Sequence, residues 1–436
     1  MTADPYAPQS GDARFHVSEY RLILRYRVLT NRLDGEATIV AVAAVDLTDF
    51  RLDLVGLKAD KVRVDGEKRT SFRQSNRRLT ITPTAPIAAG QEFRVSVRYS
   101  GSPDPRTSRW GQVGWEHLED GILVASQPIG APTWFPCNDR PADKARYRIE
   151  LTLEEGYTVA ATGLLASVAA SSGRATWTFV DDVPTATYLV ALHIGRYRYE
   201  PLSLGWVPGK VYYPAEFRGR ILADLAGLPA MMALFERLFG PYPMGHFDVV
   251  VTPDTLEIPL ESQGMAVFGA NHLDGAGSSE RLVAHELAHQ WFGNSVGISS
   301  WQDIWLNEGF SYYAEWLWSE ESGGLSAHQQ AKHHHALLAD LPLDLVTSDP
   351  GAHDMFDDRL YKRGALTLHA LRRVVGDERF FDILRSWCDQ KRHSTGTTAE
   401  FIALAEERSD VELQALFTQW LDRTSLPKIP HRTKRC

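Results

Sequence analysis

The chain has few cysteines, no long apolar run and no excess of positive charge. Cysteine occurs three times in 436 residues, at Cys137, Cys388 and Cys436, and no two of these form a C-x-x-C pair. This scarcity argues against a disulfide scaffold and against a zinc cluster built on thiolates, and it suits a reducing cytoplasm. No run of about 18 apolar residues is present, so we expect no membrane-spanning helix and no membrane partner.

The net charge and the amino-terminal residues exclude further classes of protein. The net charge is -9, which argues against a nucleic-acid partner. The first residues, MTADPYAPQSGDARFHV, contain neither a basic region nor an apolar core, so we expect no secretory signal and predict a cytoplasmic protein. Hydrophobic residues make up 44% and charged residues 23%, a balance typical of globular chains with a full core. The oligomeric state stays open, with a monomer as the working expectation.

The first 200 residues show the alternation that is typical of β-strands. In residues 20–29, apolar side chains at every second position alternate with arginines, and Ile23 is the one exception. Residues 93–99, 147–153 and 176–192 repeat this pattern, and short turn sequences separate such runs. We therefore predict an N-terminal domain over residues 1–200 that is an antiparallel β sandwich or saddle.

The pattern changes after residue 200. A Pro- and Gly-containing stretch over 201–209 reads as a linker or loop, and a helical pattern then runs from Arg218 to Gly240. Two short apolar runs, FDVVVTP and MAVFG, predict strands, and most of the remaining sequence predicts helices. The chain thus reads as an α+β protein whose second domain, residues 201–436, is mainly helical.

A His-Glu-x-x-His motif lies in this second domain. His285 and His289 are four residues apart, so on a helix both imidazoles share one face and can bind one Zn²⁺. Glu286 is offset from that face and is placed to act as a general base on a water molecule. By itself, however, the motif also fits a surface helix that carries two polar histidines.

Glu308 supplies the third ligand that a catalytic zinc needs. Eighteen residues separate it from His289, enough for one helix to end, a loop to turn and a second helix to pack back. A carboxylate among aromatic and apolar residues is costly unless it is paired or ligated, which favours the zinc site. In the intervening loop, Asp303 either orients a zinc-binding histidine or caps the second helix.

These motifs resemble those of one peptidase family. The string HELAHQWFGN, followed at the correct spacing by Asn307-Glu308-Gly309, is similar to the gluzincin aminopeptidases, the family of aminopeptidase N and leukotriene hydrolase. The resemblance implies one zinc ion held by His285, His289 and Glu308, Glu286 as general base, and a thermolysin-like catalytic domain. It extends from about residue 15 to 428, so we expect a short two-domain form without the C-terminal helical domain of most members.

A second matching motif is MFDDRLYKRGALTL, residues 355–368, which resembles the family's Tyr-x-Lys-Gly. Tyr361 and Gly364 match, whereas Arg363 stands where lysine is usual. The resemblance implies that Tyr361 donates a hydrogen bond to the oxyanion of the tetrahedral intermediate, which suits a neutral phenol. The residues alone favour a core tyrosine that caps a helix.

The family's amine-binding motif, Gly-x-Met-Glu-Asn, is altered here. Residues 258–262 read Ile-Pro-Leu-Glu-Ser, so Glu261 matches the glutamate while Ile258 replaces the glycine. Glu257 is a competing carboxylate, but the residues after Glu261 resemble the family's continuation. In the N-terminal domain, Gln127 precedes a Phe-Pro-Cys signature and matches a residue that contacts the substrate's amino terminus. Surface or structural roles for Glu261 and Gln127 are the alternatives.

The resulting prediction is a zinc aminopeptidase that removes N-terminal residues from peptides. Glu261 and Gln127, with Glu308 near, would hold the substrate's ammonium group, so peptides with a free N-terminus are the expected partners. A thermolysin-like endopeptidase is the alternative enzyme, and it would also cut N-acetylated peptides. A binding protein on an inactive peptidase fold is the third hypothesis, against which the intact Glu286 argues. No residue supports the epoxide hydrolase activity of one branch of the family.

Overall fold

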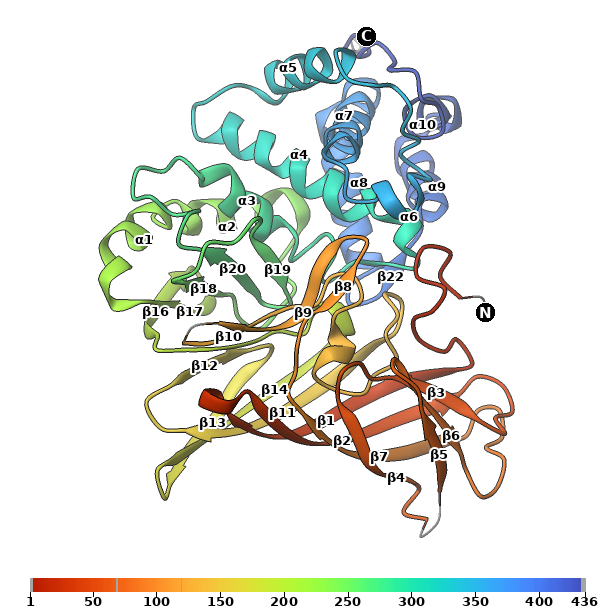
Figure 1. Cartoon of the computed structure of the whole chain (residues 1–436). Coiled ribbons are helices and arrows are strands. Elements are labelled where there is room, and N and C mark those ends of the chain that lie inside the picture. Colours follow the sequence, from red (N-terminus) through yellow and green to blue (C-terminus); the bar gives the residue numbers. More distant parts are fainter. Residues whose placement is uncertain (1–2, 68–69, 119, 433–436) are drawn as a thin grey trace.

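Alternating side chains build the β-rich half of the molecule. The computed structural model describes residues 3–67, 70–118 and 120–432. β1 (Phe15–Arg27) buries every second residue, and Ile23, the exception in the pattern, is 48% exposed among the outward-facing arginines. Figure 1 shows this β-rich part in the lower half and most helices in the upper half. The predicted α+β class, with a β domain followed by a mainly helical one, is confirmed.

A seven-stranded sheet forms the floor of the β-rich half. Its strands pair antiparallel except β1 and β11, which run parallel because the chain reaches β11 by a long crossover through two smaller sheets. The predicted antiparallel sheet therefore contains one parallel pair. In spatial order the strands are β13 (Leu164–Ser171), β14 (Arg174–Ala186), β11 (Lys144–Glu154), β1, β2 (Arg32–Ala43), β7 (Glu92–Gly101) and β4 (Lys58–Val64).

The two smaller sheets complete this half. One has the order β12 (Thr158–Ala161), β15 (Leu192–Gly195), β10 (Gly121–Ala125), β9 (Gly111–Leu118) and β8 (Arg106–Ser108), and the other has the order β3 (Phe50–Asp53), β6 (Arg78–Thr82) and β5 (Ser71–Gln74). The β8–β9 hairpin rises toward the helices in Figure 1, and Trp110 Nε1 at its tip donates to the Ala352 carbonyl at 2.8 Å. The N-terminal half therefore reaches the helical half directly.

The second half combines a mixed sheet with ten helices in the described part of the chain. The sheet has the order β16 (Arg198–Leu204), β17 (Val207–Tyr213), β18 (Asp248–Thr252), β20 (Met265–Gly269) and β19 (Leu260–Ser262), with β19 at one edge; a short pair joins β21 (Gly297–Ile298) and β22 (Thr395–Gly396). The helices are α1 (Arg218–Asp224), α2 (Leu228–Phe239), α3 (Glu280–Ala288), α4 (Trp305–Glu321), α5 (Ala327–Ala339), α6 (Gly351–Asp354), α7 (Asp358–Val375), α8 (Asp377–Gln390), α9 (Thr398–Ser409) and α10 (Gln414–Leu421).

The single helix expected over 218–240 is two helices. Pro229 lies in the first turn of α2 and has no N–H to donate to the preceding turn, so the chain breaks after Asp224 and restarts at Leu228. The predicted end is correct, because Gly240 follows α2 with a φ of +100°, a conformation that favours glycine.

The two halves pack through a shared apolar cluster. Leu123 and Ala160 of the five-stranded β12–β8 sheet lie against Tyr212, Val250 and Met265 of the second sheet, and all five side chains are buried. β16, which pairs with β17 of the second sheet, begins at Arg198; the domain boundary at residue 200 stays a prediction.

The cysteines and the helices can be compared with the expectations of no disulfide scaffold and no membrane-spanning helix. Cys137 and Cys388 are free thiols, and Cys436 lies outside the described residues. Across residues 3–67, 70–118 and 120–432, no helix combines the length and the apolar character needed to cross a membrane.

Candidate active site

Two helices bring three metal-binding side chains together. His285 and His289 lie one turn apart at the C-terminal end of α3, and Glu308 lies in the first turn of α4. Glu308 Oε2 is 3.6 Å from His285 Nε2 and 3.4 Å from His289 Nε2. One potential ligand atom from each residue lies within 4.8 Å of the others, and all three residues are buried. The helical spacing thus produces the face that the sequence predicted.

A second hydrogen bond on each imidazole orients its ring. His285 Nδ1 donates to Glu315 Oε1 at 2.7 Å, and His289 Nδ1 donates to the Phe292 carbonyl at 3.0 Å. Each Nε2 therefore keeps an unprotonated lone pair that faces Glu308. The sequence reasoning missed Glu315, although its position seven residues after Glu308, on the same face of α4, is the signal that finds it.

The three side chains fit a metal ion. Both Nε2 atoms and the Glu308 carboxylate are acceptors, so they need a cation between them. Burial alone would raise the pKa of Glu308, but the two imidazoles, when they carry a proton, outweigh burial and lower that pKa to about 2, which keeps the carboxylate charged. Two imidazole nitrogens and one carboxylate oxygen are a ligand set of catalytic zinc, which leaves the fourth position open.

Glu286 lies beside this group and is almost fully buried. Within the described residues its Oε2 has no hydrogen-bond partner, which is unusual for a buried carboxylate oxygen. Burial raises the pKa of Glu286 to about 7, and the neighbouring imidazoles act in the opposite direction. The free oxygen therefore has room and basicity to accept a proton from a water molecule in the cavity.

Two glycines bring helix α7 against helix α4. A Cβ atom added to Gly309 would lie 2.8 Å from the Cα of Gly364, and the reverse is equally close. Only glycine at both positions lets the two helix backbones approach this closely. The contact explains why both motifs contain a glycine, and it places Tyr361, one turn before Gly364, near the metal-binding group.

Tyr361 lies on the histidine side of the group. Its ring is 6.2 Å from the His285 ring with an interplanar angle of 19°. Burial raises the pKa of Tyr361 well above its ordinary value, and Glu308 and the other nearby carboxylates add to this effect. The phenol therefore stays protonated and can donate a hydrogen bond.

Gln127 and Glu261 meet across the boundary between the two halves. Gln127 Nε2 donates to Glu261 Oε1 at 2.5 Å. Glu261 comes from edge strand β19, whereas Glu257, which also lines the cavity, is exposed before that strand and makes no hydrogen bond to Gln127 in the described structure. Burial raises the pKa of Glu261, His289 opposes this, and Glu308 raises it further. Ile258, the residue that departs from the family motif, is 61% exposed.

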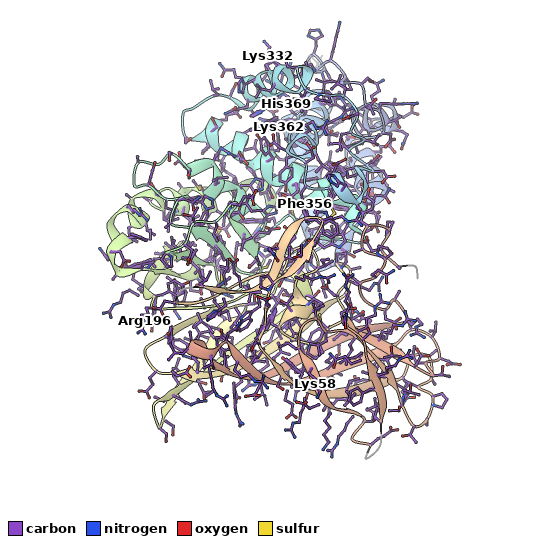
Figure 2. The ribbon with its side chains drawn as sticks, viewed as in Figure 1. Lys58, Arg196, Lys332, Phe356, Lys362 and His369 are labelled. Atoms are coloured by element: carbon purple, nitrogen blue, oxygen red, sulfur yellow. The ribbon has the colours of Figure 1, made fainter. Side chains whose placement is uncertain are left out.

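One cavity of about 620 Å³ collects all seven predicted site residues. Figure 2 labels Phe356 of the cavity wall just above the β8–β9 hairpin and Lys362 of α7 higher up. The predicted residues in the wall are Gln127, Glu261, His285, Glu286, His289, Glu308 and Tyr361. The structure places these residues together, while the chemical role of each stays a prediction.

Two further residues have clear structural partners. Arg363, which replaces the usual lysine, is buried and donates to several carbonyls in the last turn of α10 and just after it, among them Trp420 at 2.8 Å. Burial lowers its pKa to about 10. Asp303 accepts from the N–H and hydroxyl of Thr398, at 3.1 and 2.7 Å, and so supports the start of α9. It neither orients a zinc-binding histidine nor caps α4, the two roles that the sequence left open.

Two histidines on one helix, Glu308 as a third ligand, and Glu286, whose Oε2 has no hydrogen-bond partner in the described structure, define the class of site found in zinc metallopeptidases. The family model of the peptidase M1 N-terminal domain matches residues 16–189, and the model of the peptidase family M1 domain matches residues 225–420. The chain belongs to peptidase family M1. Zinc is the metal of the solved neighbours, and it suits the ligand set found here.

Similar proteins cover nearly the whole chain. The M1 zinc metallopeptidase from Deinococcus radiodurans superposes with a TM-score of 0.88 at 28% identity, over 99% of each chain. Aminopeptidase M1-C of Oryza sativa subsp. japonica is 27% identical over 99% of this chain and 52% of that protein. Leucyl aminopeptidase of Saccharolobus solfataricus is 24% identical over 95% of this chain and 54% of that protein. The chain thus spans about half the length of these curated relatives.

Proposed function

We propose that the chain is a zinc-dependent aminopeptidase that removes single residues from the N-terminus of peptides. The observation that carries this proposal is the Gln127–Glu261 pair in the same cavity as the metal-binding group. A half-buried carboxylate and an amide oxygen can both accept hydrogen bonds from a substrate's ammonium group. An internal peptide bond has no such group, so the pair selects the chain end.

The residues of the cavity supply the remaining chemistry. His285, His289 and Glu308 would hold a zinc ion, which would supply Lewis acidity toward a peptide carbonyl and a water molecule. Glu286 accepts the proton of the attacking water and passes it to the leaving amine. The Tyr361 hydroxyl donates a hydrogen bond to the oxygen on which negative charge develops. The Gln127–Glu261 pair holds the ammonium so that the first carbonyl is correctly placed.

The similar proteins support this proposal. The curated relatives reported above are named aminopeptidases, and one solved structure is an M1 zinc metallopeptidase variant from Deinococcus radiodurans bound to a Tyr-Ser-Ala substrate. That structure has a TM-score of 0.90 and 28% identity, and it covers 98% of each chain. Two-domain M1 zinc metallopeptidases bound to L-tryptophan and L-arginine are also similar.

Paired substrates test the proposal. Initial rates are measured on a panel of aminoacyl chromogenic amides, and on a peptide together with its N-acetylated form. An aminopeptidase hydrolyses the amides and the free peptide and spares the acetylated peptide. Equal cleavage of the two peptides at internal bonds would instead identify the thermolysin-like endopeptidase, and no turnover with a loaded zinc site would identify a binding protein.

Three further properties belong to the proposal. The protein is cytoplasmic and monomeric, and a domain boundary lies at residue 200. Cell fractionation tests the location, and analytical ultracentrifugation tests the oligomeric state. Separate expression of residues 1–200 and 201–436 tests the boundary through the folding of each part.

A further inference from the structure

The cavity wall contains two arginines, Arg109 and Arg281, that the proposed mechanism does not use. Arg109 follows β8 at the tip of the β8–β9 hairpin, where its guanidinium lies 5.5 Å from the Trp110 ring. Arg281 lies in the first turn of α3, the helix that carries His285 and His289. The three α3 residues are four positions apart in sequence, so they lie in a row along one face.

Arg281 and the Gln127–Glu261 pair lie at opposite ends of this row. The last residue of β19, Ser262, accepts hydrogen bonds through its carbonyl from Gln290 Nε2 at 3.1 Å and Asn294 Nδ2 at 2.8 Å. Both donors follow α3, so strand β19 and its Glu261 are tied to the C-terminal end of the helix. The metal-binding group therefore lies between the ammonium-binding pair and Arg281.

Arg281 is anchored but keeps unused donors. Its Nη1 donates to Glu315 Oε2 at 3.2 Å. Glu315 also accepts a hydrogen bond from His285, so the position of this carboxylate is fixed from two sides. The Arg281 side chain is 61% exposed, and Glu315 is its one acceptor among the residues that the structure describes. A guanidinium has five N–H donors in a planar fork, so several remain for a planar carboxylate.

Two neighbouring charges on this side have partners. Lys362 donates to Asp358, and Glu315 is shared by Arg281 and His285. A substrate carboxylate near the start of α3 would therefore find free N–H donors on Arg281.

We propose that Arg281 binds the C-terminal carboxylate of short peptides and makes the enzyme prefer tripeptides with a free C-terminus. The inference rests on the proposed function. The distance along the helix axis between Arg281 and the midpoint of His285 and His289 is about 9 Å, at 1.5 Å per residue. Two extended residues beyond the scissile carbonyl span about 7 Å, which brings a tripeptide carboxylate within reach of the guanidinium. A dipeptide falls short, and a longer peptide carries its carboxylate beyond this point.

The test compares a tripeptide with its C-terminal amide. Values of kcat/KM are measured for both substrates with the wild type, Arg281→Gln and the matched control Arg109→Gln. We expect the wild type to prefer the free acid by about tenfold, the size of one charge-assisted hydrogen bond in a partly exposed site. Arg281→Gln should bring this preference close to one, mainly through KM, whereas Arg109→Gln should keep it.

Several outcomes would overturn the inference. An equal rate of the wild type on acid and amide would do so while leaving the aminopeptidase function intact. If Arg281→Gln lowers kcat/KM equally for the acid and the amide, Arg281 only positions Glu315 and His285. Zinc content would then fall as well. Restoration of the preference by Arg281→Lys would support a role for the charge. A wild type without activity on any free peptide would overturn the proposed function itself.

Discussion

The metal-binding group and the Gln127–Glu261 pair line the same cavity, but the first is built from segments close in sequence and the second from distant ones. The metal group comes from two consecutive helices, and its histidines are four residues apart in sequence. Gln127 and Glu261 are 134 residues apart and come from different halves of the molecule. Helical periodicity sets the first arrangement, whereas packing of two sheets sets the second. The two should therefore respond separately to substitution, one through metal and turnover and the other through substrate recognition.

Removal of the metal should have the largest effect. We expect one zinc ion per chain, complete loss of hydrolysis after chelation, and recovery when zinc is added back, because three buried acceptors converge on one point. Metal analysis before and after dialysis measures this. Full activity in a sample that contains no metal would contradict the assignment.

Glu286→Gln should leave zinc and fold intact and lower kcat by about 10²- to 10⁴-fold, since an amide cannot accept the proton of the attacking water. Steady-state kinetics and zinc content on the same preparation measure this. Near-normal turnover would mean that another group activates the water.

Tyr361→Phe should lower kcat by about 10²- to 10³-fold, the usual cost of losing one donor to an oxyanion. Substrate affinity should change little, because the bond strengthens in the transition state. Tyr312→Phe is the matched control, since Tyr312 also lines the cavity. Equal effects of the two substitutions would show that Tyr361 serves packing only.

Glu261→Ala should lower kcat/KM for free-amine substrates by about 10- to 1000-fold, because a charge-assisted hydrogen bond is lost and the carbonyl is less well placed. Zinc content should not change, which distinguishes this pair from the metal group. Glu257→Ala is the control, as Glu257 is exposed and lies outside the Gln127 contact.

Two results would change that assignment. If Glu257→Ala is the impaired variant, the register across residues 257–262 is wrong by four positions. If neither variant matters and N-acetylated peptides are cut as fast as free ones, the endopeptidase alternative replaces the aminopeptidase.

Glu315→Gln should have the smallest effect of these substitutions. It tests the metal-binding group without touching a ligand or the Gln127–Glu261 pair. Loss of the charged acceptor on His285 should weaken zinc binding by about 10- to 100-fold, the usual cost of such a partner. Competition with a fluorescent chelator measures the affinity, and Glu321→Gln at the exposed end of α4 is the control. Unchanged affinity would mean that the His285 orientation is held by packing alone.

Much of the fold followed from local patterns. The period-2 runs marked β1, β7, β11 and β14, and the glycine after α2 marked its end, because alternation and turn residues act within a few positions. The break at Pro229 and the parallel pairing of β1 with β11 were missed. The first depends on how a short proline-containing turn packs, and the second depends on the path of the intervening chain.

The sequence by itself determined the metal-binding face of α3, because a spacing of four residues fixes the position of His285 and His289 on any α-helix. Resemblance to a family supplied the candidates Tyr361, Glu261 and Gln127. Only the tertiary structure decided that Gly309 and Gly364 bring α7 onto α4, and that Glu261 rather than Glu257 meets Gln127. Contacts between distant segments are set by the packing of whole sheets and helices, and no local spacing encodes them.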